Sequence, residues 1–178
     1  MTPTLVRIAT ALALTTLAAS IHAASAASKP PGPGASLKET VHLVVAGGPS
    51  AGTYDATTDR GGCTYGFAGP GSWGNQLSSS KDQDPKHFNS LQLIVPDAKK
   101  AAAGTSEFYL KIGFGPLLHR GAEYEVETRV GQPKKRGSGK LTVVDKGTTG
   151  TVTFNAKTAD GVQLTGTIDC KSVARSGK

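Results

Sequence analysis

The fold of this chain is decided by two segments near its C-terminus, TGTVTFNA (residues 149–156) and VQLTGTIDC (residues 162–170). In both segments apolar side chains alternate with polar ones, which is the period of a β-strand with one buried face. Asp160 and Gly161 lie between the two segments, and an Asp-Gly pair between alternating runs is typical of a hairpin turn. The two segments therefore predict a β-hairpin with Cys170 on its buried side.

The same alternation recurs along most of the chain and predicts further strands, at residues 41–45, 52–57, 63–67, 91–95, 108–114, 124–130 and 141–144. One short helix is predicted at residues 97–104, where Asp97 can cap the first turn and Gly104 suits the exit. Residues 69–88 are rich in Gly, Ser, Asp and Pro and predict a long surface loop. We therefore expect an all-β protein, a single antiparallel β-sandwich of eight or nine strands, Ig-like or jelly-roll-like. A small closed β-barrel is the alternative.

The N-terminal part of the chain has the pattern of an export signal. Residues 1–26 combine one basic side chain, an apolar uncharged run and a small-residue cleavage site near Ala26. Residues 27–39 are rich in Pro and Gly and predict a flexible leader. The sandwich domain is expected at residues 40–173, followed by a basic tail at residues 174–178. We therefore expect a secreted or periplasmic protein whose mature chain has no transmembrane segment.

The chain carries 20 Lys and Arg against 13 Asp and Glu, a formal charge of +7. A basic protein favours anionic partners, such as a charged envelope polymer, although its sequence contains no specific nucleic-acid motif. The densest cluster, Lys134, Lys135 and Arg136, lies in a predicted connection and is a candidate anion-binding site. Charges in connections are usually solvated surface, so convergence of the basic clusters on one face would be needed for such a role.

Only two cysteines are present, Cys63 and Cys170, and both fall on the predicted inner face of a strand. Two cysteines in an exported chain most simply form one disulfide. A bond between them would close a loop of more than a hundred residues, worth about 4–5 kcal/mol in the chain-entropy model. We therefore predict a structural disulfide between Cys63 and Cys170.

Four aromatic residues lie close together in a Gly-rich region: Tyr54, Tyr65, Phe67 and Trp73. Aromatic rings on such a surface can stack on sugar rings or bury an apolar ligand, so the four are candidate ligand-binding residues. The simpler interpretation is that they fill the end of the core beside Cys63.

Motifs for catalysis or cofactors are incomplete. The glycine pattern at residues 69–74 lacks the following helix that a dinucleotide site requires, so no cofactor is predicted. The three histidines after the signal have no metal-ligand spacing, and no metal is predicted. Glu123, Glu125 and Glu127 share one strand face, and with His119 they are the residues that could serve a hydrolase.

The sequence thus favours a non-catalytic binding or structural module of the cell envelope or extracellular space. Its partner would be an anionic envelope polymer, a glycan or another exported protein. The alternatives are a small secreted hydrolase acting on a polysaccharide or ester, and a carrier of a small hydrophobic ligand.

Overall fold

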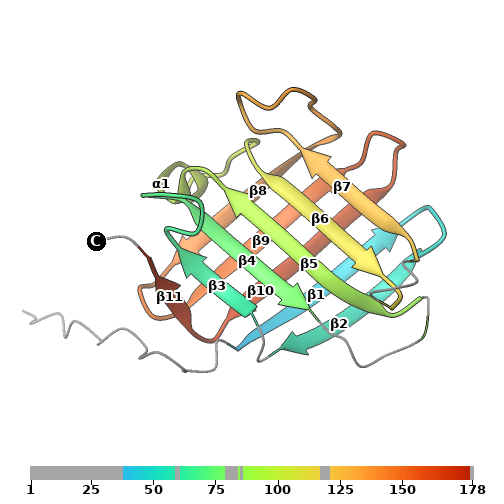
Figure 1. Ribbon diagram of the computed structural model, residues 1–178, viewed down its shortest axis with the longest axis horizontal. Helices are drawn as coiled ribbons and strands as arrows, with labels where there is room; N and C mark the ends of the chain where they lie inside the picture. The colour runs from blue at the N-terminus through green and yellow to red at the C-terminus, as the bar shows by residue number, and fades with distance from the viewer. Residues whose placement is uncertain (1–37, 59–60, 79–83, 85, 117–120, 177–178) are drawn as a thin grey trace, which may run out of the picture.

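The computed structural model describes residues 38–58, 61–78, 84, 86–116 and 121–176. These residues form two β-sheets packed face to face, with one short helix at the periphery (Figure 1). The strands are β1 (Glu39–Ala46), β2 (Gly52–Thr58), β3 (Gly61–Tyr65), β4 (Trp73–Ser78), β5 (Phe88–Val95), β6 (Tyr109–Phe114), β7 (Glu123–Glu127), β8 (Ser138–Asp145), β9 (Gly150–Lys157), β10 (Gln163–Cys170) and β11 (Val173–Arg175). The predicted all-β sandwich class is confirmed.

The five-stranded sheet has the order β2-β1-β10-β9-β8, and all its ladders are antiparallel. The predicted C-terminal hairpin is its centre, with Leu164 opposite Ala156 and Ile168 opposite Val152. Gly161 has a φ of +95°, which the turn between β9 and β10 requires and glycine adopts without strain. The backbone N–H of Thr158 closes this turn by donating to the carbonyl of Val162 at 2.9 Å.

The six-stranded sheet has the order β11-β3-β4-β5-β6-β7. Strands β3 to β7 form an antiparallel meander, in which each strand pairs with the next one along the chain. The short β11 adds to the edge of β3 and is the one parallel pairing. The two sheets stay separate. The alternative of a small closed β-barrel is therefore wrong.

The core lies between the sheets and is made by the inward-facing half of each alternating strand. Its largest fully buried side chains come from both sheets: Trp73, Phe108, Phe114, Leu43, Leu77, Leu91, Leu93, Leu110, Ile112, Leu141, Leu164 and Ile168. Fully burying one such aliphatic or aromatic side chain stabilises the folded state by about 1.5–3 kcal/mol. The alternation read from the sequence is therefore the alternation between core and solvent.

The predicted helix is present as α1 (Ala98–Ala101) and covers one end of the sandwich. Asp97 is its N-cap, and its Oδ1 accepts a hydrogen bond from the backbone N–H of Lys100 at 2.9 Å. Ala98 and Ala101 are buried, which anchors a helix too short to be stable alone.

Two strands of the structure were not expected. The long loop predicted at residues 69–88 is wrong in part, because β4 occupies Trp73–Ser78. Trp73, Asn75 and Leu77 of this segment face inward and Gln76 and Ser78 are exposed, but its Gly, Asn, Gln and Ser content concealed the pattern. The three-residue β11 lies at the start of the predicted basic tail, and β1 begins at Glu39, one residue before the predicted domain.

Candidate functional site

The outer face of the six-stranded sheet presents polar residues in ordered rows. Gln76 of β4 lies opposite Gln92 of β5, and Gln92 lies opposite Lys111 of β6. In the next row Ser78 lies opposite Ser90, and Ser90 lies opposite Gly113. Because successive side chains alternate between faces, all of these residues point away from the core. The rows place carboxamide, hydroxyl and ammonium groups side by side on one surface.

A cleft of about 250 Å³ lies across these rows, and we call it the outer-face cleft. Its polar lining includes Gln76, Ser78, Asn89, Ser90, Gln92, Lys111 and Glu123. Gly113 lines the cleft without a side chain, and the Ser90 hydroxyl fills the space beside it, since a Cβ at this position would lie 2.4 Å from the Ser90 Oγ. The ladder between β5 and β6 shifts register between Phe88 and Ser90, and such bulges commonly accompany binding sites. The cleft therefore lies beside a glycine and a bulge of the same sheet.

Two larger side chains extend the same face beyond the cleft. Phe67 is 38 % exposed and packs over Gly74, where a Cβ would lie only 2.3 Å from the Phe67 Cγ. Tyr109 of β6 is half-buried, and the guanidinium of Arg129 lies 5.1 Å from its ring centroid. Burial, together with the nearby Glu125, raises the pKa of Tyr109, so its hydroxyl stays neutral.

The three glutamates of β7 are each paired with a cation. Glu123 lies 2.8 Å from the Lys111 Nζ, and Glu125 lies 3.4 Å from an Arg136 nitrogen. Glu127 is almost buried and receives two hydrogen bonds from the Arg129 guanidinium, at 2.9 and 2.5 Å. Burial alone would raise the pKa of Glu127, but the hydrogen bonds and charge of Arg129 outweigh it and hold the pKa below its usual value. Glu127 is therefore stabilised in its ionised form.

Three of the four aromatic candidates lie together, since Tyr65 is opposite Trp73 in the ladder of β3 and β4 and Phe67 covers Gly74, whereas Tyr54 belongs to β2 of the other sheet. Trp73 has no exposed surface and lies in the core, so its ring is not part of a ligand-facing surface. Tyr54 packs edge-on against Phe114 at 4.9 Å between centroids, and Tyr65 lies under the guanidinium of Arg175 at 4.9 Å. Only Phe67 remains on an open face. Close spacing in the sequence therefore kept Tyr65, Phe67 and Trp73 near one another, but Trp73 faces the core and Phe67 faces the solvent.

The basic cluster Lys134, Lys135 and Arg136 is exposed on the connection between β7 and β8. Figure 1 shows this connection at the same end of the sandwich as α1, while β11 lies at another part of the periphery. Arg136 is tied to β7 through Glu125 and through a backbone bridge to Glu127. Lys134 and Lys135 are the two exposed lysines of this connection.

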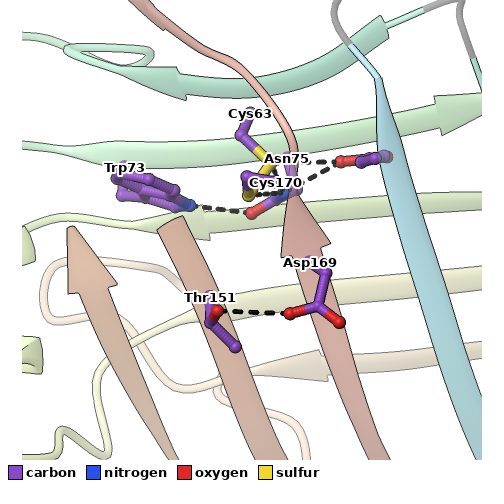
Figure 2. Close-up of a disulfide and its surroundings, with 7 residues drawn as sticks. Cys63, Trp73, Asn75, Thr151, Asp169 and Cys170 are labelled. Atoms are coloured by element: carbon purple, nitrogen blue, oxygen red, sulfur yellow. Dashed lines mark hydrogen bonds between the residues drawn. A yellow bond between two sulfur atoms is a disulfide. The ribbon is translucent and has the colours of Figure 1, made fainter. Parts of the chain in front are cut away.

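The predicted disulfide between Cys63 and Cys170 is present and joins β3 of one sheet to β10 of the other (Figure 2). Asn75 lies beside it, and its Nδ2 is 2.8 Å from the Cys63 Sγ. The indole N–H of Trp73 donates to the Asn75 Oδ1 at 2.8 Å. A third polar side chain, Glu39, completes this buried group, with its Oε2 accepting from the Asn75 Nδ2 at 3.0 Å.

The sequence pattern predicted neither the outer-face cleft nor the buried group of Glu39 and Asn75 beside the disulfide. Gln76 and Ser78 were assigned to a loop, and Glu39 to the flexible leader, so neither was considered as part of a site. A period-two reading of Trp73, Asn75 and Leu77 could have found β4. His119 lies outside the described residues, and within the described ranges no cluster of three His, Cys, Asp or Glu side chains could hold a metal ion.

No family model matches the sequence, and neither a curated protein nor a solved structure is significantly similar to it. Within the described part of the chain, no helix is long and apolar enough to cross a membrane. The chain is thus defined by its fold class, a two-sheet β-sandwich whose sheets are linked by one buried disulfide.

Proposed function

We propose that this protein is an exported, non-catalytic binding module that holds a hydroxyl-rich ligand, a glycan, in the outer-face cleft. The observation that carries the proposal is the row of Gln76, Gln92 and Lys111 along the outer-face cleft. A carboxamide both donates and accepts hydrogen bonds, which is what sugar hydroxyls require of a partner. A cleft of about 250 Å³ suits one or two sugar units rather than a large apolar molecule.

The apolar side chains beside the cleft support the same ligand class. Ile94 lies between Gly74 and Tyr109 in the row next to Gln92, and Phe67 covers Gly74. Ring and aliphatic surfaces of this kind pack against the C–H face of a sugar, while the neighbouring amides bind its hydroxyls. The outer face therefore offers the two kinds of contact that a glycan needs.

The ion pairs of the glutamates favour binding over hydrolysis. A glycosidase needs one carboxyl group that stays protonated to act as the acid. Glu127 is held ionised by Arg129, and Glu123 and Glu125 are each ion-paired. A hydrolase would have to break these pairs before it could use the carboxyl groups.

Export is supported by the disulfide and by the N-terminal sequence. Disulfides persist in oxidising compartments, and Cys63 and Cys170 are joined here. The apolar run and small-residue site before residue 27 fit a signal segment. Both features are consistent with a periplasmic or extracellular binding module.

The test is a binding screen of the oxidised protein against neutral and acidic oligosaccharides, followed by two-dimensional NMR titration. We expect shifts centred on Gln76, Ser90, Gln92 and Gly113. The double substitution Gln76→Ala and Gln92→Ala should weaken binding about tenfold, because each lost hydrogen bond contributes about 0.5–1.5 kcal/mol.

The matched control is Gln163→Ala, which removes a glutamine side chain from the outer face of the five-stranded sheet. This variant should bind as the unchanged protein does. Binding that is equally weakened in both variants, shifts centred on Lys134 and Lys135, or no oligosaccharide binding at all would contradict the proposal.

A further inference from the structure

Glu39 is a buried carboxylic acid at the start of β1. It has no exposed surface, and in the ladders of the five-stranded sheet it lies opposite Cys170 of β10 and Thr58 of β2. A buried ionised carboxylate is costly unless a cation or several hydrogen-bond donors compensate its charge. The groups around Glu39 therefore decide its protonation state.

These groups are all neutral. Thr58 faces Glu39 from β2, the disulfide faces it from β3 and β10, and Asn75 faces it from β4. Its Oε2 accepts one hydrogen bond from the Asn75 Nδ2 at 3.0 Å, while its Oε1 is buried with no hydrogen-bond partner among the described residues. Asp169, which precedes Cys170 in β10, points to the opposite face of the sheet and accepts from Thr151 (Figure 2).

The contact with the disulfide gives an independent argument about the proton. The Glu39 Oε2 lies 3.4 Å from the Cys63 Sγ, within hydrogen-bonding reach for sulfur. A disulfide sulfur carries no hydrogen, so only a protonated Glu39 can supply one to this contact. In agreement with this, burial raises the pKa of Glu39 from 4.5 to about 7, although the hydrogen bond from Asn75 opposes the shift.

We propose that Glu39 is a proton-controlled latch on the Cys63–Cys170 disulfide. When the carboxyl group is neutral, it donates to the Cys63 Sγ and keeps the junction of β1, β3 and β10 closed around the disulfide. When the carboxyl group loses its proton, the charge is uncompensated in the core, and the junction opens to hydrate it. Opening exposes a disulfide that is otherwise inaccessible, since Cys63 and Cys170 are both buried.

The exposed disulfide then reacts with a thiol reductant. A thiolate of a dithiol attacks one cysteine sulfur, the bond between the two cysteines breaks, and the second thiolate closes a new disulfide within the reductant. Two electrons pass from the dithiol to the protein, and the two released cysteine sulfurs take up the two protons that the dithiol has lost. The latch thus makes reduction of this protein depend on pH beyond the dependence of the reductant itself.

The test compares reduction rates of the oxidised protein and its Glu39→Gln variant by dithiothreitol between pH 5 and 8.5. A glutamine can donate to the Cys63 Sγ as the neutral carboxyl does, but it cannot ionise. The rate of the unchanged protein is divided by the rate of Glu39→Gln, which cancels the titration of dithiothreitol. We expect this ratio to rise at least tenfold from pH 5 to pH 8.5. A ratio that stays constant with pH would overturn the proposal.

Asp169→Asn is the matched control, because Asp169 precedes Cys170 but points away from the disulfide. Its rate should follow that of the unchanged protein at every pH. If Glu39→Gln does not fold, the unchanged protein labelled with ¹³C-glutamate keeps the proposal testable. Its Glu39 carboxyl signal should titrate near pH 7, together with the onset of rapid reduction by a phosphine, whereas a midpoint near 4.5 would contradict the latch.

Discussion

Glu39 and Cys170 are direct partners in the ladder between β1 and β10, which holds a carboxyl group against the disulfide that joins the two sheets. The same disulfide is bordered on the other side by Asn75, whose amide connects Glu39 to the indole of Trp73. An ionisable carboxyl group, a covalent link and a large core side chain are thus coupled at one junction. The stability of the protein should depend on all three.

Stability should fall as the pH rises from 4.5 to 8. The pKa of Glu39 in the folded protein is raised to about 7, so the folded state binds its proton more tightly than the unfolded chain. This contribution is fully present below pH 4.5 and is lost as the pH rises through 7. A shift from 4.5 to about 7 corresponds to about 3 kcal/mol. Denaturant unfolding at a series of pH values should show this decrease, and Glu39→Gln should flatten it.

Loss of the disulfide should destabilise the sandwich strongly. Cys63 and Cys170 are 107 residues apart in sequence, and in the chain-entropy model a link of this length contributes about 4–5 kcal/mol. The double substitution Cys63→Ala and Cys170→Ala should lower the free energy of unfolding by a similar amount, measured by urea denaturation at pH 5. A loss below about 1 kcal/mol would show that the link adds little to the packed core.

The ion pair of Glu127 and Arg129 should stabilise the folded protein more than the ion pair of Glu125 and Arg136 does. Arg129→Leu leaves a nearly buried carboxylate without its cation and should cost about 2 kcal/mol at pH 7. Since the pKa of Glu127 is lowered in the folded protein, the contribution of the pair exists above the ordinary pKa and disappears as the pH falls. Urea unfolding at pH 7 and pH 3 should therefore show a smaller loss in acid.

Arg136→Leu is the control for this experiment. Its pair with Glu125 is longer, at 3.4 Å, and the Arg136 side chain is half exposed. Exposed pairs contribute only about 0–1 kcal/mol, so this variant should unfold nearly as the unchanged protein does. Equal losses in the two variants would contradict the difference in burial.

Filling the outer-face cleft should abolish glycan binding without unfolding the protein. Gly113 lies in β6 and has no left-handed backbone conformation, so a β-branched residue is compatible with its strand. Gly113→Val combined with Ser90→Ala places a side chain in the cleft and removes the hydroxyl that it would strike. Thermal unfolding should change little, while calorimetric titration should detect no binding. Ser90→Ala alone should keep the cleft open and retain most of the affinity.

Much of the fold could be predicted from the sequence because core and solvent faces alternate along each strand. Residues 149–156 and 162–170 predicted the central hairpin, and Asp97 predicted the cap of α1; both are confirmed. The pairing of Cys63 with Cys170 followed from the number of cysteines and their inward positions, and it is also confirmed. Strand β4 was not predicted because its composition resembles that of a turn, although Trp73, Asn75 and Leu77 are spaced two apart, as the inward residues of a strand are.

The local pattern of apolar and polar residues determined which segments are strands, which face of each strand is buried, and which cysteines pair. Only the tertiary structure decided that Glu39 lies against the disulfide, that Trp73 is in the core, and that Gln76, Gln92 and Gly113 share one surface. The physical reason is the range of the interactions involved. Alternation is a property of neighbours in sequence, whereas the environment of a side chain depends on the order and register of strands that are distant in the chain.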